Sequence, residues 1–350
     1  MLKYNNITPN KIYYRNVLIK AVKGCDGSNV WEYQEPAPTH DYSSDYLTIR
    51  ALSANTNVIY SVDNTAITKT ISASTDNGQT WTGYTPTTNG TVIATLGEGD
   101  KVLLKGENLY YGQKIGSSLY NHTIVASNHP VIEGNIMSLI SGDSFTNATA
   151  LSAPYAFYGL FTNSGYATAE NLVLPATTLT DYCYQNMFKS SQITTPPALP
   201  ATVLTNSCYY AMFDGSSITT APVLSSTTLA QNCYGSMFRG CTGLTTAPEL
   251  PATTLANGCY YSMFENCTAL TAAPVLPAPT LVFTCYGVMF NGCTNLSSIT
   301  CLATDISASN CTSNWVYGVS SVGTFTKASG MSAWTTGNKG IPEYWTVVDA

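Results

Sequence analysis

A unit of 25 or 26 residues recurs through the second half of the chain. Its marker is the segment C-Y-x-x-M-F, which begins at Cys183, Cys208, Cys233, Cys259 and Cys285. The segments that begin at Ala156 and Cys311 fit the same template, 27 residues before the first marker and 26 after the last. A repeat of this length is a unit that must stack on its neighbours to bury its apolar face. The sequence therefore predicts seven stacked coils.

Each predicted coil has two limbs. In the limb that begins with the marker, apolar residues fall at i, i+1, i+4, i+5 and often i+8, which predicts one face of a short helix. A left-handed residue that ends this helix is expected at Gly215, Gly240, Asn266 and Gly292. The other limb is extended, because its prolines restrict the preceding residue to β or polyproline geometry. Such limbs should stack as parallel strands, roughly 4.8 Å apart.

The cysteines follow the repeat, since only Cys25 of the 11 lies outside it. A thiol with a methionine four residues later is typical of a packed layer of small and large side chains. Seven residues separate Cys259 from Cys267, which does not match the spacing of a zinc site. The same pair would lie about 12 Å apart in a helix, beyond disulfide reach, whereas bridges between coils stay open. The second cysteine occurs only in the 26-residue coils, and the 25-residue coils carry serine there.

The rest of the chain has the pattern of short β-strands. Residues 1–36 are too few for an independent core, which predicts an N-terminal attachment module. Residues 37–45 are rich in Pro, Ser and Asp and predict a linker. Residues 46–135 predict an antiparallel β-sandwich domain. The coils follow as a solenoid with parallel strands at 136–315, and residues 316–350 form a C-terminal cap. The expected fold class is mixed and β-rich.

One segment inside the predicted sandwich, Ser74–Trp81, fits the Asp-box pattern S-x-D-x-G-x-T-W seen in sialidases. The box is a hairpin whose Asp caps its own turn, so the pattern predicts structure rather than activity. A sialidase also needs an arginine cluster for the substrate carboxylate. The chain has only Arg15, Arg50 and Arg239, in three different segments. A glycan hydrolase is therefore the least favoured function.

Other catalytic arrangements are also missing from the sequence. His40, His122 and His129 lie outside any G-x-S-x-G or H-E-x-x-H setting. Glu98 and Asp100 form an acidic pair, but the neighbouring glycines indicate a turn. We expect a protein that is not an enzyme, with no catalytic residue, cofactor or metal.

The composition of the chain argues against two classes of binding partner, nucleic acids and membranes. Only 10% of the residues are charged, and the net charge is −6 with no Lys or Arg cluster, which argues against nucleic acid. The amino terminus lacks the apolar segment of a signal peptide, and no window approaches the apolar length of a membrane span. We expect no membrane insertion. A surface made polar by hydroxyl and amide groups is typical of extracellular and virion β-rich proteins.

Binding is the remaining function class. Positions that vary between coils while the core stays constant should face outward. The candidates two residues after each marker cysteine are Gln185, Tyr210 and Tyr261, with Gly235 and Gly287 in the same register. The candidates six residues after it are Lys189, Asp214, Arg239, Glu265 and Asn291. The alternative is that these are ordinary solvent positions.

A second candidate surface is one slot of the extended limb, which holds Val173, Ala198, Val223, Glu249, Val275 and Cys301. Five of these six residues are apolar, so the slot would favour a protein contact if it is exposed.

The repeat resembles the BspA-type leucine-rich repeat over about residues 150 to 315. The shared order is L-x-x-A-P-x-L-P, then T-T-L, then C-Y-x-x-M-F-x-G-C. This chain departs from the family by using Met-Phe for the usual Ala-Phe and by adding two or three residues per coil. The departure predicts a fuller helical limb.

The two ends of the chain are similar to virion proteins of tailed phages of gut anaerobes, including crAss-like phages. The resemblance rests on Lys11–Val22, Val30–Glu32, Lys327–Gly337 and Trp345–Ala350. It implies a head or tail fibre or decoration protein of the virion, which binds other virion proteins through residues 1–36. Its solenoid would adhere to a host-surface glycan or protein, and the chain would form a homotrimer. The alternative is a BspA-like adhesin on a bacterial cell surface.

Overall fold

The computed structural model describes residues 12–14, 17–23, 29–33 and 40–350. The chain divides into two compact units, Met1–Asp41 and Tyr42–Ala350. The first contains an antiparallel sheet made of β1 (Ile12–Tyr14), β2 (Val17–Lys23) and β3 (Asn29–Tyr33). These strands agree with the short β-strands that the sequence predicts outside the repeat. Much of the predicted module and linker, with Arg15 and Cys25, lies outside the described residues.

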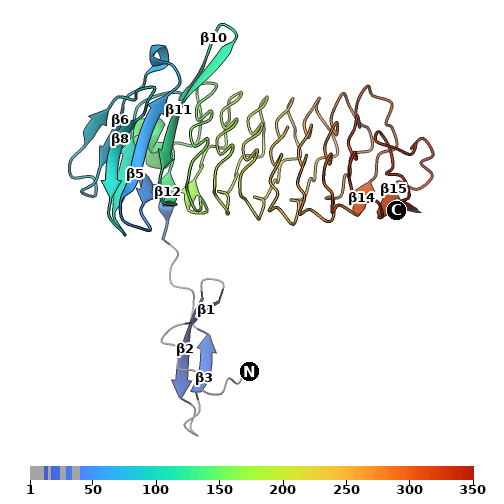
Figure 1. Cartoon of the computed structure of the whole chain (residues 1–350), viewed down its shortest axis with the longest axis horizontal. Helices are drawn as coiled ribbons and strands as arrows, with labels where there is room; N and C mark the ends of the chain where they lie inside the picture. The colour runs from blue at the N-terminus through green and yellow to red at the C-terminus, as the bar shows by residue number, and fades with distance from the viewer. Residues whose placement is uncertain (1–11, 15–16, 24–28, 34–39) are drawn as a thin grey trace. The chain divides into compact units, whose positions relative to one another are not determined.

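Two sheets begin the second unit (Figure 1). The first has the order β10-β11-β5-β8. It consists of β5 (Thr56–Val62), β8 (Thr91–Leu96), β10 (Gly112–Ile115) and β11 (Ser118–Ala126). The second has the order β13-β12-β4-β9-β6-β7. It consists of β4 (Leu47–Arg50), β6 (Ile71–Ser74), β7 (Thr82–Tyr84), β9 (Lys101–Lys105), β12 (Val131–Asn135) and β13 (Leu172–Val173).

Helical structure is brief in the part of the chain that the structure describes. It comprises η1 (Tyr42–Ser44), η2 (Thr65–Ile67), α1 (Ser138–Ser141) and η3 (Gly142–Asn147). The protein is β-rich, with antiparallel and parallel strand pairs, which confirms the coarse fold class.

The second sheet continues into the first coil. Strand β12 pairs antiparallel with β4 on one side and parallel with β13 on the other, with Gly134 opposite Leu172. Gly134 has φ +85°, and a Cβ there would collide with the Tyr46 carbonyl, so only glycine fits. Buried residues of both sheets and of all the coils form one continuous apolar cluster. The coils are therefore built directly onto a sheet edge.

The coils stack side by side along the unit (Figure 1). Their aromatic residues form two columns, with ring centroids 5.3–5.9 Å apart in the phenylalanine column and 5.6–6.1 Å apart in the tyrosine column. The phenylalanine column comprises Phe161, Phe188, Phe213, Phe238, Phe264 and Phe290. Beside it the first thiol and the methionine of the five coils with the full marker, such as Cys259 and Met263, are fully buried. The predicted small-and-large layer is confirmed.

The expected helix in the marker limb is wrong. This limb, which we call the turn limb, is a series of tight turns in every coil that the structure describes. Positive φ recurs at every fourth residue, as at Tyr182 (63°), Asn186 (58°) and Ser190 (54°). The left-handed residues expected at Gly215, Gly240, Asn266 and Gly292 are present, but each is the last of three such positions in its coil. A residue with positive φ reverses the local twist, so no α-helix can propagate.

Backbone hydrogen bonds in the turn limb alternate between two directions. The N–H of Gln185 closes a turn by donating to the Tyr182 carbonyl at 3.3 Å. The N–H of the next residue, Asn186, donates to the Tyr210 carbonyl of the following coil at 3.0 Å. The pattern repeats through the stack, so every second amide joins neighbouring coils. The ladder that was expected between extended limbs lies mainly between turn limbs.

The extended limb, which we call the proline limb, has fewer such donors. Pro197, Pro222, Pro248 and Pro274 occupy equivalent positions in successive coils and have no N–H. Parallel pairing there is reduced to isolated bridges such as Val203–Thr228 and Ala272–Ser298. Among the described strands, a fully parallel three-stranded sheet forms at the C-terminal end, from β14 (Ser298–Cys301), β15 (Thr324–Lys327) and β16 (Thr346–Asp349).

Candidate binding surface

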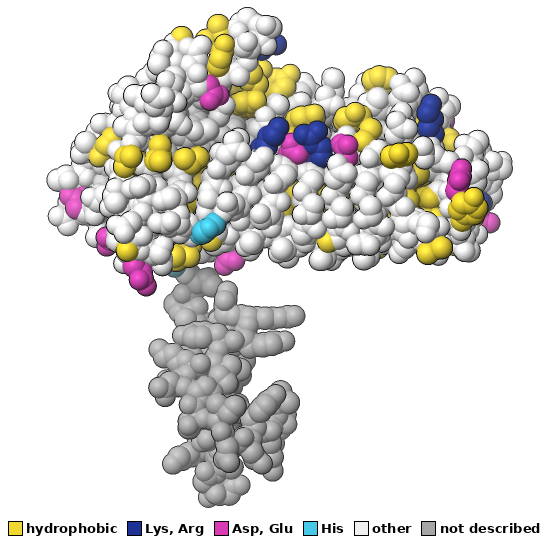
Figure 2. Space-filling model, viewed as in Figure 1, with side chains coloured by type: hydrophobic (Ala, Val, Ile, Leu, Met, Phe, Trp, Pro, Cys, Tyr) yellow, Lys and Arg dark blue, Asp and Glu magenta, His cyan; other side chains and the backbone are white. Residues whose placement is uncertain are grey.

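Four charged side chains form a row across successive coils. The Asp214 carboxylate accepts hydrogen bonds from Arg239 Nε at 2.9 Å and Nη2 at 2.7 Å. Lys189 Nζ lies 3.3 Å from the same carboxylate, and Glu265 follows Arg239 in the next coil. The hydrogen bonds from Arg239 to Asp214 raise the pKa of the guanidinium, and Glu265 adds to this effect. Figure 2 shows this alternation of dark blue and magenta along the coils, with yellow side chains beside it.

Asp214 differs from the other members of the row, because it is only 6% exposed. Asp214 lies in the outer row, but it is not open to solvent as expected, because Lys189 and Arg239 cover it from the coils on either side. Glu265 and Asn291 are half-buried, and Asn291 Nδ2 donates to the Asn314 carbonyl at 3.5 Å. The structure thus brings together Lys189, Asp214 and Arg239 as one ion network.

The positions two residues after the marker alternate between large and small. Tyr261 is 37% exposed and Tyr210 is half-buried. Gly235 and Gly287 are buried, so their expected outward position is wrong. A Cβ on Gly235 would lie 2.8 Å from Tyr210 Cδ2, and one on Gly287 would lie 3.2 Å from Tyr261 Cδ2. Each tyrosine therefore covers the glycine of the next coil.

Two further residues complete this register. Gln185 is half-buried, and its Oε1 has no hydrogen-bond partner in the structure. Tyr158 occupies the same position in the first coil, and its hydroxyl accepts a hydrogen bond from Asn186 Nδ2 at 3.0 Å. Tyr158 is absent from the predicted set, although the match of Ala156 to the marker was sufficient to find it.

The slot of the proline limb is largely exposed. Val223 is 79% exposed and Val275 is 54% exposed, and Ala198 and Glu249 are also exposed. A shallow groove crosses Thr219–Ser225 and Thr245–Glu249. Cys301 does not meet the condition of exposure, because it is fully buried and its side chain in β14 belongs to the apolar core.

The described cysteines are free and buried. Burial raises the pKa of the Cys183 and Cys233 thiols to about 12, which removes the thiolate needed for reactivity. The second thiol of the longer coils has its own contact: Cys267 Sγ donates to the Phe238 carbonyl of the preceding coil at 3.0 Å. Cys241 and Cys293 make the same contact, at 3.0 and 2.9 Å.

The extra residue of the longer coils accounts for this thiol. In a 25-residue coil the Ser217 N–H donates to the Ser191 carbonyl of the preceding coil at 3.1 Å. In a 26-residue coil the chain turns locally instead, with Leu244 N–H donating to the Cys241 carbonyl at 3.1 Å. The cysteine Sγ then makes the hydrogen bond to the preceding coil at the end of the turn limb, where the backbone hydrogen bond of the shorter coils is missing.

The Asp-box is self-contained. Asp76 Oδ1 accepts from Ser74 Oγ at 2.7 Å and from the Thr80 N–H at 2.9 Å. These hydrogen bonds lower the pKa of Asp76 to about 2. Trp81 Nε1 donates to the Gly78 carbonyl at 3.1 Å, and its ring packs against Tyr46. The polar side chains of the box form hydrogen bonds within its own turn, which agrees with a structural role.

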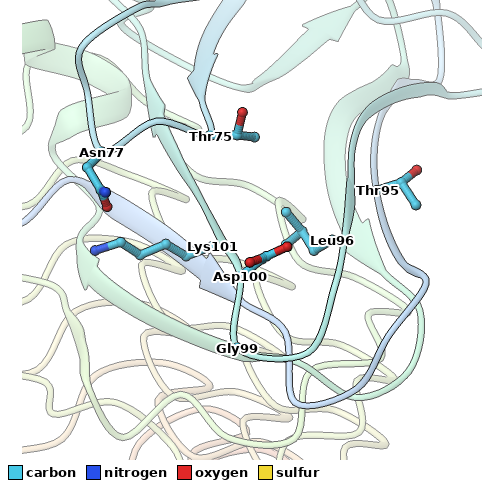
Figure 3. A pocket seen from close by; sticks show the side chains of 7 residues that line it. All are labelled: Thr75, Asn77, Thr95, Leu96, Gly99, Asp100 and Lys101. Atoms are coloured by element: carbon cyan, nitrogen blue, oxygen red, sulfur yellow. The ribbon is translucent and has the colours of Figure 1, made fainter.

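A depression near the Asp-box is lined by residues of the box and of the two strand ends that face it. Figure 3 shows Thr75 and Asn77 on one side and residues of the β8–β9 connection on the other. Asp100, the acidic residue in this depression, accepts from the Gly97 N–H at 3.0 Å. Gly99 has φ +82°, so the predicted turn around the Glu98 and Asp100 pair is confirmed.

His122 and Arg50 have partners within the fold. His122 is buried, with Nδ1 2.8 Å from the Tyr111 carbonyl and Nε2 accepting from the Lys69 N–H at 3.0 Å. Arg50 pairs with Glu133 at 3.0 Å. Among residues 40–350 and the three short N-terminal strands, no group of three metal-ligating side chains is clustered. No described helix has the length and apolarity to cross a membrane.

Comparison with known proteins finds no family model, no curated protein and no solved structure that matches the chain. The resemblances to BspA-type repeats and to phage virion proteins therefore stay predictions, and function has to be argued from the surface itself.

Proposed function

We propose that this protein is a non-enzymatic fibre or decoration protein of a tailed-phage virion, which adheres to the host surface through its coils. The observation that carries the proposal is the contrast between a constant core and a variable outer row. The thiol, Tyr, Met and Phe positions are fully buried in successive coils, whereas the outer row changes from Lys189 to Asp214, Arg239 and Glu265. Variation confined to the surface is typical of recognition by repeat proteins.

The finer architecture belongs to the same proposal. It comprises an N-terminal attachment module at 1–36, a β-sandwich at 46–135, a BspA-type leucine-rich-repeat solenoid at 136–315 and a C-terminal cap at 316–350. Residues 1–36 would bind other virion proteins, and the chain would form a homotrimer. The stacking of buried side chains at one register per coil supports the solenoid. The turn limb is a departure from the proposed family.

The non-enzymatic role is supported by the state of the reactive groups. In the described part of the chain, the carboxylate of Asp76 caps its own turn, His122 is held in the core and Arg50 is paired with Glu133. A catalytic site needs groups that converge on a substrate. The outer rows offer binding groups only. Hydrolysis of a glycan by the purified chain would contradict this part of the proposal.

The test is incorporation into particles. The full chain and a chain that lacks residues 1–36 are each expressed during infection by the phage that carries the gene, and the purified particles are probed for the protein. We expect the full chain in particles and the shortened chain in the soluble fraction. Full chain that is missing from particles but present on the bacterial envelope would favour the adhesin alternative instead. Equal incorporation of both chains would remove the attachment role of residues 1–36.

A further inference from the structure

Tyrosine recurs in every second coil on the outer face of the turn limb. Tyr158, Tyr210 and Tyr261 share one register, and the coils between them carry Gln185 and Gly235 there. The core does not require this alternation, because the Cys, Tyr, Met and Phe positions are buried alike in the five coils that carry the full marker. A surface feature with a period of two coils therefore calls for a separate explanation.

The glycines fix where the rings lie. The Cδ2 and Cε2 atoms of Tyr210 would lie 2.8 and 2.9 Å from a Cβ on Gly235, so the ring occupies the space that a side chain would need. Tyr261 covers Gly287 in the same way. Tyr158 is covered in turn by β10, where a Cβ on Gly112 would lie 2.5 Å from Tyr158 Cβ. The open part of the register therefore holds Tyr210 and Tyr261.

The distance between coils matches the length of a sugar unit. Successive phenylalanine rings beneath this surface are 5.9 Å apart from Phe213 to Phe238 and 5.6 Å apart from Phe238 to Phe264. One pyranose unit of an extended polysaccharide has a similar length. In a β-1,4-linked chain each unit is turned over relative to the last, so the same face recurs at every second unit. Tyr210 and Tyr261, two coils apart, have that period.

The polar groups beside the tyrosines suit an uncharged ligand. Arg239 is bound to Asp214 through two of its five N–H donors, and Lys189 is also paired with Asp214. With Glu265 the row carries two positive and two negative charges. A polyanion would gain little here, because both cations are already paired. Sugar hydroxyl groups can accept from the free donors of Arg239 and donate to the Glu265 carboxylate, whereas the Asp214 carboxylate is covered.

We propose that Tyr210 and Tyr261, with Arg239 and Glu265 beside them, bind an uncharged, extended polysaccharide of β-1,4-linked hexopyranose units. Alternate sugars pack their C–H faces on the two rings, and their hydroxyls bond to the charged row. The inference rests on the proposed adhesive function and specifies its ligand.

The test is calorimetric titration of the full chain with cellohexaose. We expect binding of cellohexaose and at least tenfold weaker binding of the α-linked maltohexaose, which curves away from the row. Tyr210→Ala and Tyr261→Ala should each weaken binding by about tenfold, since each removes one ring platform. Tyr210→Phe keeps the ring and should bind as the wild type does.

Two variants separate the site from general effects on the fold. Gly235→Ala keeps Tyr210 but displaces its ring, so it should weaken binding although the tyrosine is present. Tyr344→Ala removes a tyrosine that is 88% exposed and lies outside the register, and it should leave binding unchanged.

No binding of cellohexaose by the wild type would overturn the inference. Binding by both alanine variants that is as tight as binding by the wild type would also overturn it. A chain found in particles that does not bind cellohexaose would keep the proposed function and lose only this ligand. A chain that binds cellohexaose but is missing from particles would keep this ligand and lose the proposed role in the virion.

Discussion

The turn limb and the proline limb of each coil are held to their neighbours by different means. In the turn limb every second backbone N–H crosses to the next coil, as from Tyr234 to the Cys259 carbonyl at 3.0 Å. In the proline limb Pro222 and Pro248 have no N–H, and the contact rests on buried side chains such as Leu224 and Leu250. Neighbouring coils are thus aligned in two ways: by backbone hydrogen bonds in the turn limb and by the burial of apolar side chains in the proline limb.

This division has a consequence for the surfaces of the two limbs. Since most turn-limb amides are used within the stack, the outer side chains there can change without affecting the ladder. In the proline limb the missing donors leave little for a foreign strand to pair with, although Val223 is 79% exposed. Prolines at such a position prevent edge-to-edge association.

The largest expected effect is on a ring of the phenylalanine column. Phe238→Ala removes a fully buried side chain that stacks on Phe213 and Phe264, which should lower the free energy of unfolding by about 3–5 kcal/mol. Val223→Ala, on the exposed side of the proline limb, should change it by no more than about 0.5 kcal/mol. Urea denaturation of both variants measures the difference. Similar values for the two would contradict the placement of Phe238 in the core and of Val223 on the exposed side of its coil.

A smaller effect is expected from adding one methyl group to a glycine. Gly258 in the turn limb has φ +63°, and a Cβ there would collide with Asn232 Oδ1 of the preceding coil. Gly258→Ala should cost about 1–3 kcal/mol of stability. Gly243 lies where the turn limb has ended, and its nearest contacts from a Cβ would be 3.5 Å away. Gly243→Ala should be nearly neutral in thermal melting, and a larger loss there than at Gly258 would refute the role of the turns.

The smallest expected effect on stability is at Cys267, where the turn limb ends and the proline limb begins. Cys267→Ala removes the contact from Sγ to the Phe238 carbonyl and should cost about 1 kcal/mol. Cys267→Ser should not recover this loss, because the shorter C–O bond keeps the hydroxyl from the carbonyl. Ser191, which has the same place in a shorter coil, has a buried hydroxyl without a partner. A serine variant as stable as the wild type in urea would disprove this account.

The sequence predicted the register of the coils but not the geometry of the turn limb. Apolar residues at i, i+1, i+4, i+5 and i+8 satisfy a period of 4.0 as well as one of 3.6, and nine residues are too few to separate the two. Glycine or asparagine indicates positive φ at some positions, such as Gly240. Thr284 and Val288 also adopt it, at 53° and 61°, although β-branched residues disfavour that conformation. Only stacking on both sides can impose it there.

The candidate surface was predicted in part. Variation between coils identified Lys189, Arg239 and Tyr261, because an outward position is free to change. It could not show that Asp214 is covered, since burial by two long side chains from other coils depends on where those side chains fold. Variation also could not show that the Tyr210 ring packs on Gly235. A glycine at a variable position gives no sign in the sequence that a neighbouring side chain needs its space.

The junction at β12 gives the stack a starting point that the coils themselves do not provide. Gly134 and Asn135 pair with Leu172 and Val173, so the sheet sets the register of the first coil. Each later coil is aligned by its hydrogen bonds to the coil before it. Whole coils can then be gained or lost in the interior, between Gly240 and Gly292 for example, without a change at either end. The length of the outer face can therefore change by one coil at a time through unequal recombination of the repeats, while the sheet that begins the stack stays as it is.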